Sequence, residues 1–440
     1  MNPKASASPG VALAGLLLLL CGAVQAADIV AAKIELTPAE QEMIAWIGER
    51  GDQMLAELGS HVAINTGTSN VAGINSYRAG LAEDLQRLGF ATREHASAPF
   101  EVLTCEGGEV EIADHLVATR TGKSPNRILL NGHMDTVFPA EDEFQSLTVE
   151  PDGTLHGPGV LDMKGGIVVM LNALRALEVA GYLERANLTV LLTSDEEIGS
   201  LGSRELIEQL AGEHDLGLVF EGTRDNLMTR SRKGLGQVRL KVTGREAHAG
   251  AKHEEGVSAN LELAHQVIAI EQLTDYESNI TVNVGVMRGG EKRNTIPGCA
   301  DAYIDLRYLT VEAGQALVGA IDTIATKPHI SNPEYPDVPR TEVWTRLHRP
   351  VKDVNPEVDA LIAEAMGLSA LIAEPVAGGM YSGGGTDGSI AQAVGLPTLD
   401  SLGLDGQGAH SSRETTSLKS LMARTKLAAV MIARQIDKQP

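Results

Sequence analysis

With 440 residues the chain is too long for one ordinary hydrophobic core, and its 43% of hydrophobic residues can supply the cores of two domains. Aromatic residues make up only 3% of the sequence, which argues against stacking platforms for nucleic acid. The formal net charge is −22, and such a surface repels nucleic-acid phosphates and anionic membranes. We therefore expect neither nucleic acid nor a membrane as a partner of the mature chain.

The N-terminus has the pattern of a secretory signal peptide. Lys4 gives a short positive region, residues 11–20 form an apolar run, and residues 23–26 read Ala-Val-Gln-Ala, a small-residue cleavage site. The alternative is a membrane anchor, but the run is shorter than the roughly 20 residues that span a bilayer. We expect residues 1–26 to be removed and the protein to be secreted into the periplasm.

The cysteines indicate little by themselves. Cys21 would leave with the signal peptide, so the mature chain keeps Cys105 and Cys299. One pair is not a disulfide framework, and neither residue has metal-ligand neighbours.

After the signal peptide, residues 37–88 have apolar positions at helical spacing. Short apolar runs then alternate with amphipathic helical segments. The runs cover residues 127–130, 188–192 and 216–220, and the helical segments cover residues 167–177 and 203–210. This alternation predicts an α/β fold with a doubly wound, mostly parallel sheet.

A different pattern follows residue 232. Residues 236–244, 279–287 and 300–310 alternate between apolar and polar side chains, as antiparallel strands with one solvated face do. Helical stretches lie between and after them, at residues 261–270 and 311–326, and a proline-rich linker covers residues 331–340. We expect an inserted α+β domain at residues 233–349. The catalytic domain, residues 27–232 and 350–440, would then be discontinuous.

Five separated segments carry side chains that bind metals. These are His133 in NGHMDTV, Asp162 in GPGVLDMKGG, Glu196–Glu197 in TSDEEIGS, Glu221 in VFEG and His410 in GQGAHSSRE. Ligands of doubly wound sheets bind beyond the carboxyl ends of the strands, and most of these segments follow an expected strand. Two imidazoles and three carboxylates can hold two divalent ions and leave one carboxylate as a base.

Each segment also has a simpler interpretation. His133 is compatible with a surface histidine, although Asp135 lies close enough to orient its ring. Asp162 could cap a helix, since aspartate is favoured there. Residues 195–197 could form a solvated acidic turn, and Glu221 and His410 could be incidental. Only the order of the segments and their common position at strand ends favour a metal site.

The motifs, taken together, resemble a known family. GHMDTV, GPGVLDMKGG, TSDEEIGSLGSREL, FEG, VTGREAHAG, NTIPG, DLR, GGGTDG and GAHSSRE occur in the order found in the dizinc exopeptidases and deacylases. That family includes glutamate carboxypeptidase (carboxypeptidase G), aminoacylase and succinyl-diaminopimelate desuccinylase. The resemblance covers nearly all of the mature chain, and TSDEEIGSLGSREL and GGGTDG are most similar to the glutamate carboxypeptidase branch.

The resemblance implies a ligand set. His133 and Glu221 would hold one Zn²⁺, Glu197 and His410 the other, and Asp162 would bridge them through a carboxylate next to a cis peptide bond. Co²⁺ or Mn²⁺ could replace zinc.

The resemblance also implies the other site residues. Glu196 would be the general base, and Asp135 would support His133. His248 would reach the active site of a partner subunit, which implies a homodimer built through the inserted domain. Without the family, His248 reads as a strand-edge residue.

The substrate's carboxylate end would contact Asn294 and Arg307, and Gly384 and Gly385 would offer backbone donors near it. By themselves Arg307 reads as an exposed strand residue and the glycines as a flexible turn. Two departures from the family are Met163, where many relatives have aspartate, and the stretch at residues 230–234, which is more basic than expected for the glutamate-specific branch and leaves the side-chain specificity open.

The function implied is a secreted dizinc hydrolase that cleaves an amide or peptide bond and releases a C-terminal amino acid. An N-acyl-amino-acid deacylase or a dipeptidase would use the same metal chemistry. A protein of another class, an inactive binding protein on the same fold, remains the alternative to an enzyme.

Overall fold

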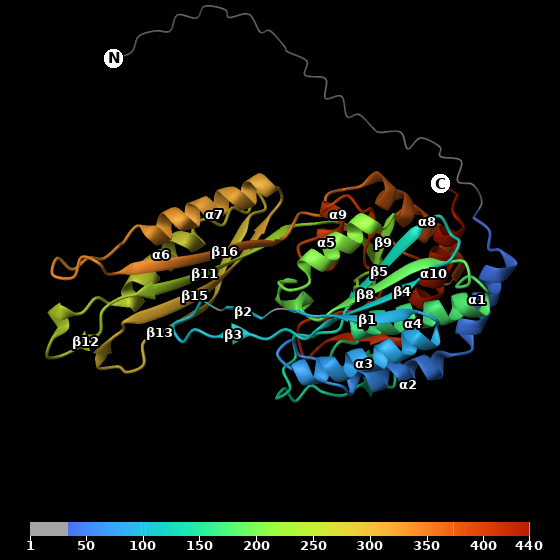
Figure 1. Ribbon diagram of the computed structural model, residues 1–440, viewed down its shortest axis with the longest axis horizontal. Coiled ribbons are helices and arrows are strands. Elements are labelled where there is room, and N and C mark those ends of the chain that lie inside the picture. The colour runs from blue at the N-terminus through green and yellow to red at the C-terminus, as the bar shows by residue number, and fades with distance from the viewer. Residues whose placement is uncertain (1–33, 98, 102, 373, 440) are drawn as a thin grey trace, which may run out of the picture. The chain divides into compact units, whose positions relative to one another are not determined.

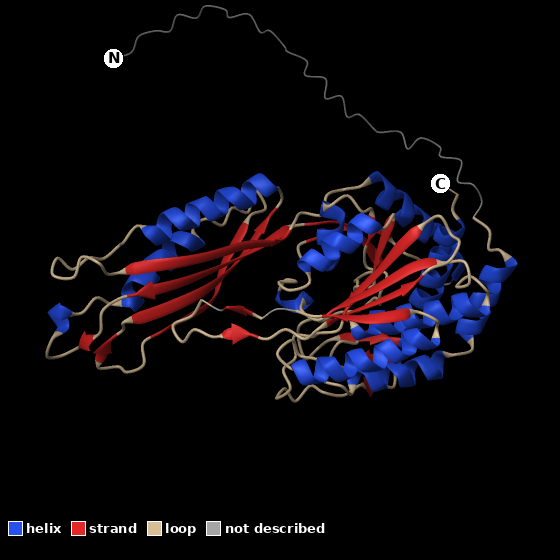
Figure 2. Cartoon of the chain, viewed as in Figure 1, coloured by secondary structure: helices blue, strands red, loops and turns tan. Residues whose placement is uncertain are grey.

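A mixed six-stranded sheet forms the centre of the part of the chain that carries the expected ligands (Figures 1 and 2). The structure is a computed structural model that describes residues 34–97, 99–101, 103–372 and 374–439. The expected signal peptide lies outside these residues. Within them, no helix combines the length and the apolar character needed to cross a membrane.

The order of the strands in this sheet is β1-β4-β8-β5-β9-β18. Their bounds are Ala91–His95 (β1), His115–Arg120 (β4), Asn187–Thr193 (β8), Arg127–His133 (β5), Leu216–Val219 (β9) and Thr398–Leu399 (β18). β8, β5, β9 and β18 are parallel to one another, whereas β1 and β4 add antiparallel pairs at one edge. The predicted doubly wound sheet is therefore confirmed, with an antiparallel edge that the sequence pattern did not indicate.

Helices cover both faces of this sheet. Their bounds are Pro38–Gly48 (α1), Gly51–Val62 (α2), Val71–Arg87 (α3), Lys164–Val179 (α4), Arg204–Glu213 (α5), Pro356–Ile372 (α8), Asp387–Ala393 (α9) and Leu418–Asp437 (α10). Leucines and isoleucines of α5 and α9 pack against Val117, Leu129 and Leu191 on one face. α4 contacts β5 with α10, α1 and α2 packed around it, and these helices cover the opposite face.

The start of α4 depends on glycine. A Cβ atom on Gly166 would lie 1.9 Å from the carbonyl oxygen of Phe220, and one on Gly165 would lie 2.1 Å from that of Val160. No side chain fits at these distances, so the two glycines let the helix begin directly against the chain that follows β9. This close packing brings the residue pair before α4, Asp162 and Met163, next to Glu221.

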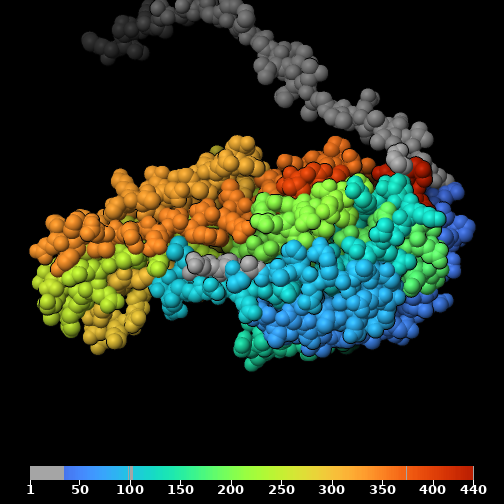
Figure 3. Space-filling view, viewed as in Figure 1, coloured from blue at the N-terminus to red at the C-terminus, as the bar shows by residue number. Residues whose placement is uncertain are grey.

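The inserted domain has a four-stranded antiparallel sheet of order β13-β15-β11-β16. Its strands are Gly234–Thr243 (β11), Thr281–Gly289 (β13), Cys299–Tyr308 (β15) and Arg340–Arg349 (β16). Two helices, Ala259–Glu271 (α6) and Val311–Thr326 (α7), pack their apolar residues on one face of the sheet. In the space-filling view the residues of the inserted domain, yellow-green to orange, gather on the left (Figure 3). β16 directly follows the proline-rich linker and was not expected from the sequence.

Residues 36–440 cluster as one compact unit, so the division into domains at residues 233 and 349 stays a prediction. Small pairings complete the fold. They are β10 (Leu227–Arg232) with β17 (Gly378–Ser382), β12 (Ala247–His248) with β14 (Thr295–Ile296), β19 (Thr415–Ser417) with β7 (Thr154–His156) and β6 (Thr148–Val149), and β2 (Phe100–Glu101) with β3 (Glu109–Val110).

Cys105 and Cys299 form a disulfide between the β2–β3 hairpin and the first residue of β15, with their Cα atoms 5.9 Å apart. The backbone N–H of Cys105 also donates to Asp301 Oδ1, at 3.1 Å. The pairing was not expected from the sequence, because the two cysteines lie 194 positions apart. The disulfide joins the inserted domain to a hairpin of the catalytic domain.

Candidate metal centre

Four of the five expected metal ligands lie close to where a strand or helix of the catalytic domain begins or ends. His133 is the last residue of β5, Glu197 lies in the 3₁₀ turn Glu196–Ile198 after β8, and Glu221 follows β9. Asp162 stands just before α4, so it does not cap this helix; the N-cap is Met163, whose side chain makes no capping bond. His410 lies in the loop before β19 with a φ of 62°. The parallel strands therefore bring His133, Glu197 and Glu221 to one edge of the sheet, and the segments before α4 and β19 add Asp162 and His410.

Asp162 stands between two sets of ligand atoms. Its Oδ1 lies 3.1 Å from His133 Nε2, which lies 3.5 Å from Glu221 Oε1. Its Oδ2 lies 3.1 Å from His410 Nε2, which lies 3.2 Å from Glu197 Oε2. One carboxylate oxygen thus belongs to each set, as in a carboxylate that bridges two ions. The peptide bond between Asp162 and Met163 is cis, as the family resemblance implies.

The two sets fit metal ions in spacing and chemistry. Ligand atoms bound tetrahedrally to zinc at about 2 Å lie roughly 3.3 Å from one another, close to the distances found here. In addition, Oε1 of Glu197 is buried and has no hydrogen-bond partner among the described residues. A buried carboxylate oxygen without a partner is costly, and an ion would satisfy it.

The protonation of these groups also fits cation binding. Burial opposes protonation of His133, but Glu221, Asp135 and Asp162 hold its pKa well above the usual range. Hydrogen bonds to Asp162 and Glu197 raise the pKa of His410 to about 11. Burial favours the neutral form of Asp162, yet the two imidazoles lower its pKa. The acidic cluster thus attracts positive charge, and a metal ion can take the place of the two imidazole protons.

Glu196 faces the same site: one of its carboxylate oxygens lies within 4.8 Å of ligand atoms of His133 and Glu221, although the family resemblance gives it no place in either set. It lines a cavity of about 690 Å³ together with Asp162, Glu221 and His410. Burial raises the pKa of Glu196 well above its usual range, and the guanidinium of Arg349, 2.6 Å from its Oε1, opposes this shift. A carboxylate with a raised pKa beside the ligands has the chemistry of a general base.

Asp135 supports the turn of Glu196 and Glu197 as well as the ring of His133. The Nδ1 atom of His133 lies 3.0 Å from the backbone carbonyl of Asp135 and 3.4 Å from its carboxylate. The same carboxylate accepts the backbone N–H groups of Glu196 and Glu197 at 3.2 Å each, and the hydroxyl of Thr68 at 2.9 Å. Asp135 therefore fixes the turn that carries the two glutamates.

Gly384 and Gly385 line the cavity, and Arg307 reaches its rim by donating to the carbonyl of Gly383 at 3.2 Å. The guanidinium of Arg307 also donates to both carboxylate oxygens of Asp305, at 2.6 and 3.0 Å. The arginine expected to hold a substrate carboxylate is thus partly engaged within the chain.

His248 and Asn294 lie together on the inserted domain, away from this group. His248 pairs with Thr295 in β12–β14, and the next residue, Ala249, donates its N–H to the carbonyl of Asn294 at 3.0 Å. Among the described residues, the hydrogen bonds of His248 stay within residues 247–296 and involve none of the expected ligands. The predicted residues therefore form two separate clusters within one chain.

Several residues of the site were missed by sequence reasoning. Glu414 accepts the backbone N–H groups of Gly159, Leu161 and Asp162 at 2.7–3.1 Å, and so holds the loop of the bridging carboxylate. Arg232 lines the cavity and donates to Asp400 Oδ2 at 2.7 Å. Glu414 belongs to the GAHSSRE motif and Arg232 to the basic stretch, which were the available indications.

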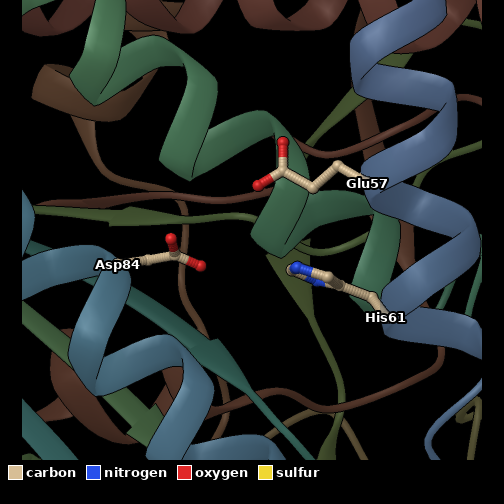
Figure 4. A group of neighbouring side chains, drawn as sticks. All are labelled: Glu57, His61 and Asp84. Carbon is tan, nitrogen blue, oxygen red and sulfur yellow. The ribbon is translucent and has the colours of Figure 1, made fainter.

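A further histidine–carboxylate cluster lies on α2 and α3, formed by Glu57, His61 and Asp84 (Figure 4). Arg175 lies 2.8 Å from Glu57 and 3.6 Å from Asp84, and Arg87 lies 2.8 Å from Asp84, so two arginines already balance these carboxylates. His61 Nδ1 lies 2.8 Å from the hydroxyl of Tyr77, and burial, with the charge of Lys164, lowers its pKa to about 4. We assign this cluster a structural role and no metal.

Comparison with known proteins settles the family. The model of peptidase family M20/M25/M40 matches residues 129–434. The chain belongs to this family. It is similar to carboxypeptidase G2 of Pseudomonas sp. (strain RS-16), with 31% identity over 378 residues, 84% of this chain and 86% of the relative. Acetylornithine deacetylase of Myxococcus xanthus is 30% identical over 271 residues, 58% of this chain and 68% of the relative.

Solved structures agree on the fold. A tripeptidase from Staphylococcus aureus subsp. aureus Mu50 superposes with a TM-score of 0.67 at 22% identity, covering 88% of this chain and 99% of that chain. The resemblance inferred from the motifs is thus confirmed, and membership of this family makes the protein a metal-dependent hydrolase of amide bonds.

Proposed function

We propose that this member of family M20/M25/M40 is a secreted dizinc carboxypeptidase, which releases a C-terminal amino acid from small peptides or N-acyl amino acids. The observation that carries the proposal is the position of Asp162, with one oxygen facing each ligand set, beside a cavity that Glu196 also lines. Similarity to carboxypeptidase G2 over 84% of the chain supports the choice of substrate class.

The residues of this chain would divide the reaction as follows. His133, Asp162, Glu197, Glu221 and His410 would hold two Zn²⁺ ions, which when bound polarise the scissile carbonyl and make water more acidic. Glu196 takes a proton from the attacking water and returns it to the nitrogen of the leaving amino acid. Asp135 keeps Glu196 beside the ligands by holding the turn at residues 196–197.

The orientation of His248 supports a role at the developing oxyanion. Its Nδ1 accepts the backbone N–H groups of Gly250 and Ala251, both at 3.1 Å. The proton of the neutral ring is therefore on Nε2, which is free to donate. Because His248 does not contact the ligands of its own chain, we propose that it serves the active site of a second subunit.

The inserted domain offers a surface for that homodimer. Leu261 and Ile268, two turns apart on α6, are 51% and 61% exposed. β13 is an edge strand of the antiparallel sheet, and Met287 on it is 47% exposed. The open edge of such a strand, beside exposed apolar side chains, is a common basis for a two-fold interface.

Arg307 is suited to bind the carboxylate end of the substrate. Three of its five N–H groups are used by Asp305 and Gly383, which leaves two for a substrate carboxylate. Gly384 and Gly385 line the same cavity, and the N–H of Gly384 donates to the hydroxyl of Ser382 at 3.2 Å. With Asn294 of the partner subunit, these donors would select substrates that end in a free α-carboxylate.

Secretion is supported by the disulfide between Cys105 and Cys299. Structural disulfides form and persist mainly in oxidising compartments such as the periplasm. The expected signal peptide at residues 1–26 is consistent with this location.

The second candidate, an N-acyl-amino-acid deacylase, is favoured by similarity to acetylornithine deacetylase. A dipeptidase would use the same ligands. An inactive binding protein on this fold is disfavoured by the intact set of ligands with Glu196 beside it.

The test is a side-by-side hydrolysis assay of an N-acyl-glutamate, an N-acetyl amino acid, a dipeptide and the corresponding amide-capped substrates, with metal content measured on the same sample. We expect about two zinc ions per subunit, turnover of substrates with a free carboxylate, and loss of turnover after capping. Faster hydrolysis of the N-acetyl amino acid would favour the deacylase. Bound metal without any turnover would favour the binding protein.

A further inference from the structure

The last residue of β16, Arg349, reaches from the inserted domain to the candidate general base. Its side chain is only 2% exposed. Its Nη2 atom donates to the backbone carbonyl of Glu196 at 3.0 Å and to the carboxylate Oε1 of the same residue at 2.6 Å. One guanidinium nitrogen thus fixes both the backbone and the side chain of Glu196.

The other nitrogen anchors the guanidinium on the catalytic domain. Nη1 donates to Asp387 Oδ1 at 2.9 Å and to the hydroxyl of Ser200. Asp387 in turn accepts the hydroxyl of Thr193, the last residue of β8, at 2.7 Å. On the side of the inserted domain, the Tyr308 hydroxyl donates to the carbonyl of Arg349 at 3.2 Å. The guanidinium therefore has a single orientation, set from both domains.

Two glycines of the catalytic domain make room for the last two residues of β16, His348 and Arg349. Gly199, directly after the turn of the base, has a φ of 100°, and a Cβ atom there would lie 2.4 Å from the ring of His348. A Cβ atom on Gly385 would lie 2.9 Å from Cγ of Arg349. Gly199 lets the turn that carries Glu196 pack directly on the end of β16, and Gly385 does the same for the cavity-lining loop at residues 383–385.

We propose that Arg349 is a positioning residue for Glu196: it holds one carboxylate oxygen so that the other is presented to the attacking water, and it links the base to the orientation of the inserted domain. This rests on the proposed function of Glu196 as the base. A carboxylate on a flexible side chain loses rate when it can turn away from the reacting water. Because Arg349 ends β16, a displacement of this strand displaces the base.

A purely structural role for Arg349 makes a different prediction. Arg349 balances two buried carboxylates, and removing it would leave both unpaired and lower stability. A structural role predicts a lower melting temperature or lost metal with an unchanged turnover number for the folded, metal-loaded fraction. A positioning role predicts a lower kcat in folded protein with unchanged KM and metal content.

The experiment compares Arg349→Lys with Arg349→Met in the full-length secreted protein, using kcat, KM, zinc content and melting temperature. Lysine keeps the charge but cannot reach both Glu196 and Asp387 with a planar fork. We expect Arg349→Lys to fold with both metals and unchanged KM, and to lose about 10- to 100-fold in kcat, the range for a misplaced catalytic group. If Arg349→Met does not fold, Arg349→Lys carries the test.

Arg204→Met is the matched control. Arg204 also joins the catalytic domain to the end of β16, by donating to the carbonyl of His348 at 2.8 Å, but it does not contact Glu196. We expect its kcat to match that of the wild type. An equal loss in both variants would assign the effect to domain docking and overturn the proposal.

Glu196→Gln provides the background that separates this inference from the proposed function. If Arg349 acts through the base, Arg349→Lys should cost little further kcat once Glu196 is glutamine. The same fold loss in both backgrounds, a wild-type kcat in Arg349→Lys, or loss of zinc from it would each overturn the proposal. Wild-type turnover in Glu196→Gln alone would instead refute the proposed base.

Discussion

At the scale of single residues, Glu196 and Glu197 are neighbours with different environments. Glu197 points an oxygen at His410, 3.2 Å away, whereas Glu196 is bound by Arg349. The difference arises because Asp135 accepts both of their backbone N–H groups and so fixes the turn. One side chain is held among the expected ligands and the other lies along the cavity.

The first prediction follows for Glu196→Gln. This change keeps the shape of the side chain and removes its ability to accept a proton, so turnover should fall at least about a hundredfold. Zinc content should equal that of the wild type, because Glu196 belongs to neither ligand set. Kinetics and elemental analysis on one preparation check both statements. Glu205→Gln, an exposed change in the first turn of α5, is the control.

The second prediction concerns Asp162→Ala, which removes a ligand atom from each set at once. We expect loss of at least one zinc ion and a lower melting temperature, since metal that binds only the folded state stabilises it. Asp152→Ala, an exposed aspartate in a turn, should change neither. Full zinc occupancy in Asp162→Ala would refute a bridging role.

Residues of the site differ in how far the sequence could predict them. His133 and Glu221 could be singled out because each closely follows a buried apolar run, and the family resemblance then gave each a role. Arg349 was not, because its partners Glu196 and Asp387 are distant in the sequence and β16 follows a proline-rich linker. Arg232 was noticed only as part of a basic stretch, and its burial against Asp400 depends on tertiary packing.

At the scale of secondary-structure elements, regular periodicity was the reliable guide. The segment expected as a helix at residues 311–326 is α7, and the run at residues 188–192 lies within β8. The antiparallel edge of the sheet was harder to predict, because β1 has no run of buried residues. Its residues 91–95 are exposed or half-buried. A strand without an apolar face gives no period to detect.

The third prediction comes from packing between α2, α3 and α4. His61 is buried there among Tyr77, Lys164, Arg175 and the carboxylates of Glu57 and Asp84, and its pKa falls from 6.5 to about 4. Between these values the unfolded chain binds a proton at this position and the folded chain does not. Stability from this group is therefore complete above pH 6.5 and is lost as the pH falls towards 4.

One pKa unit corresponds to about 1.36 kcal/mol, so the loss is about 3 kcal/mol across that window. Denaturant unfolding at several pH values checks this. His61→Gln should lose about 3 kcal/mol less than the wild type between pH 6.5 and 4, and His253→Gln, at an exposed position, should follow the wild type. Parallel curves for all three proteins would exclude His61 as a source of acid sensitivity.

At the scale of the whole molecule, His248 and the ligands occupy separate places in one chain. If two chains complete each other's sites, two inactive variants can restore activity between them. A heterodimer of His248→Ala and Glu196→Gln subunits has one site with both defects and one with neither. This expectation is specific to a histidine that acts across the interface.

The fourth prediction is that mixing these variants restores up to about a quarter of wild-type activity, because random exchange makes about half the dimers heterodimers. Subunit exchange must be demonstrated with mass-tagged chains. Mixing His248→Ala with a second His248→Ala preparation is the control and should restore nothing. Exchange without recovery would mean that His248 acts in its own chain or has no part in the reaction.

The disulfide between Cys105 and Cys299 has a consequence for a chain that a protease has cut. His133, Asp162, Glu197 and Glu221 all lie inside the covalent ring that it closes, and only His410 lies outside. A protease that cuts the ring once, for example in the exposed loop at residues 251–254, leaves the two pieces joined. The nicked protein should migrate as one chain without reductant and as two with it. After such a cut, the disulfide keeps the segments that carry the expected ligands in one covalently linked molecule.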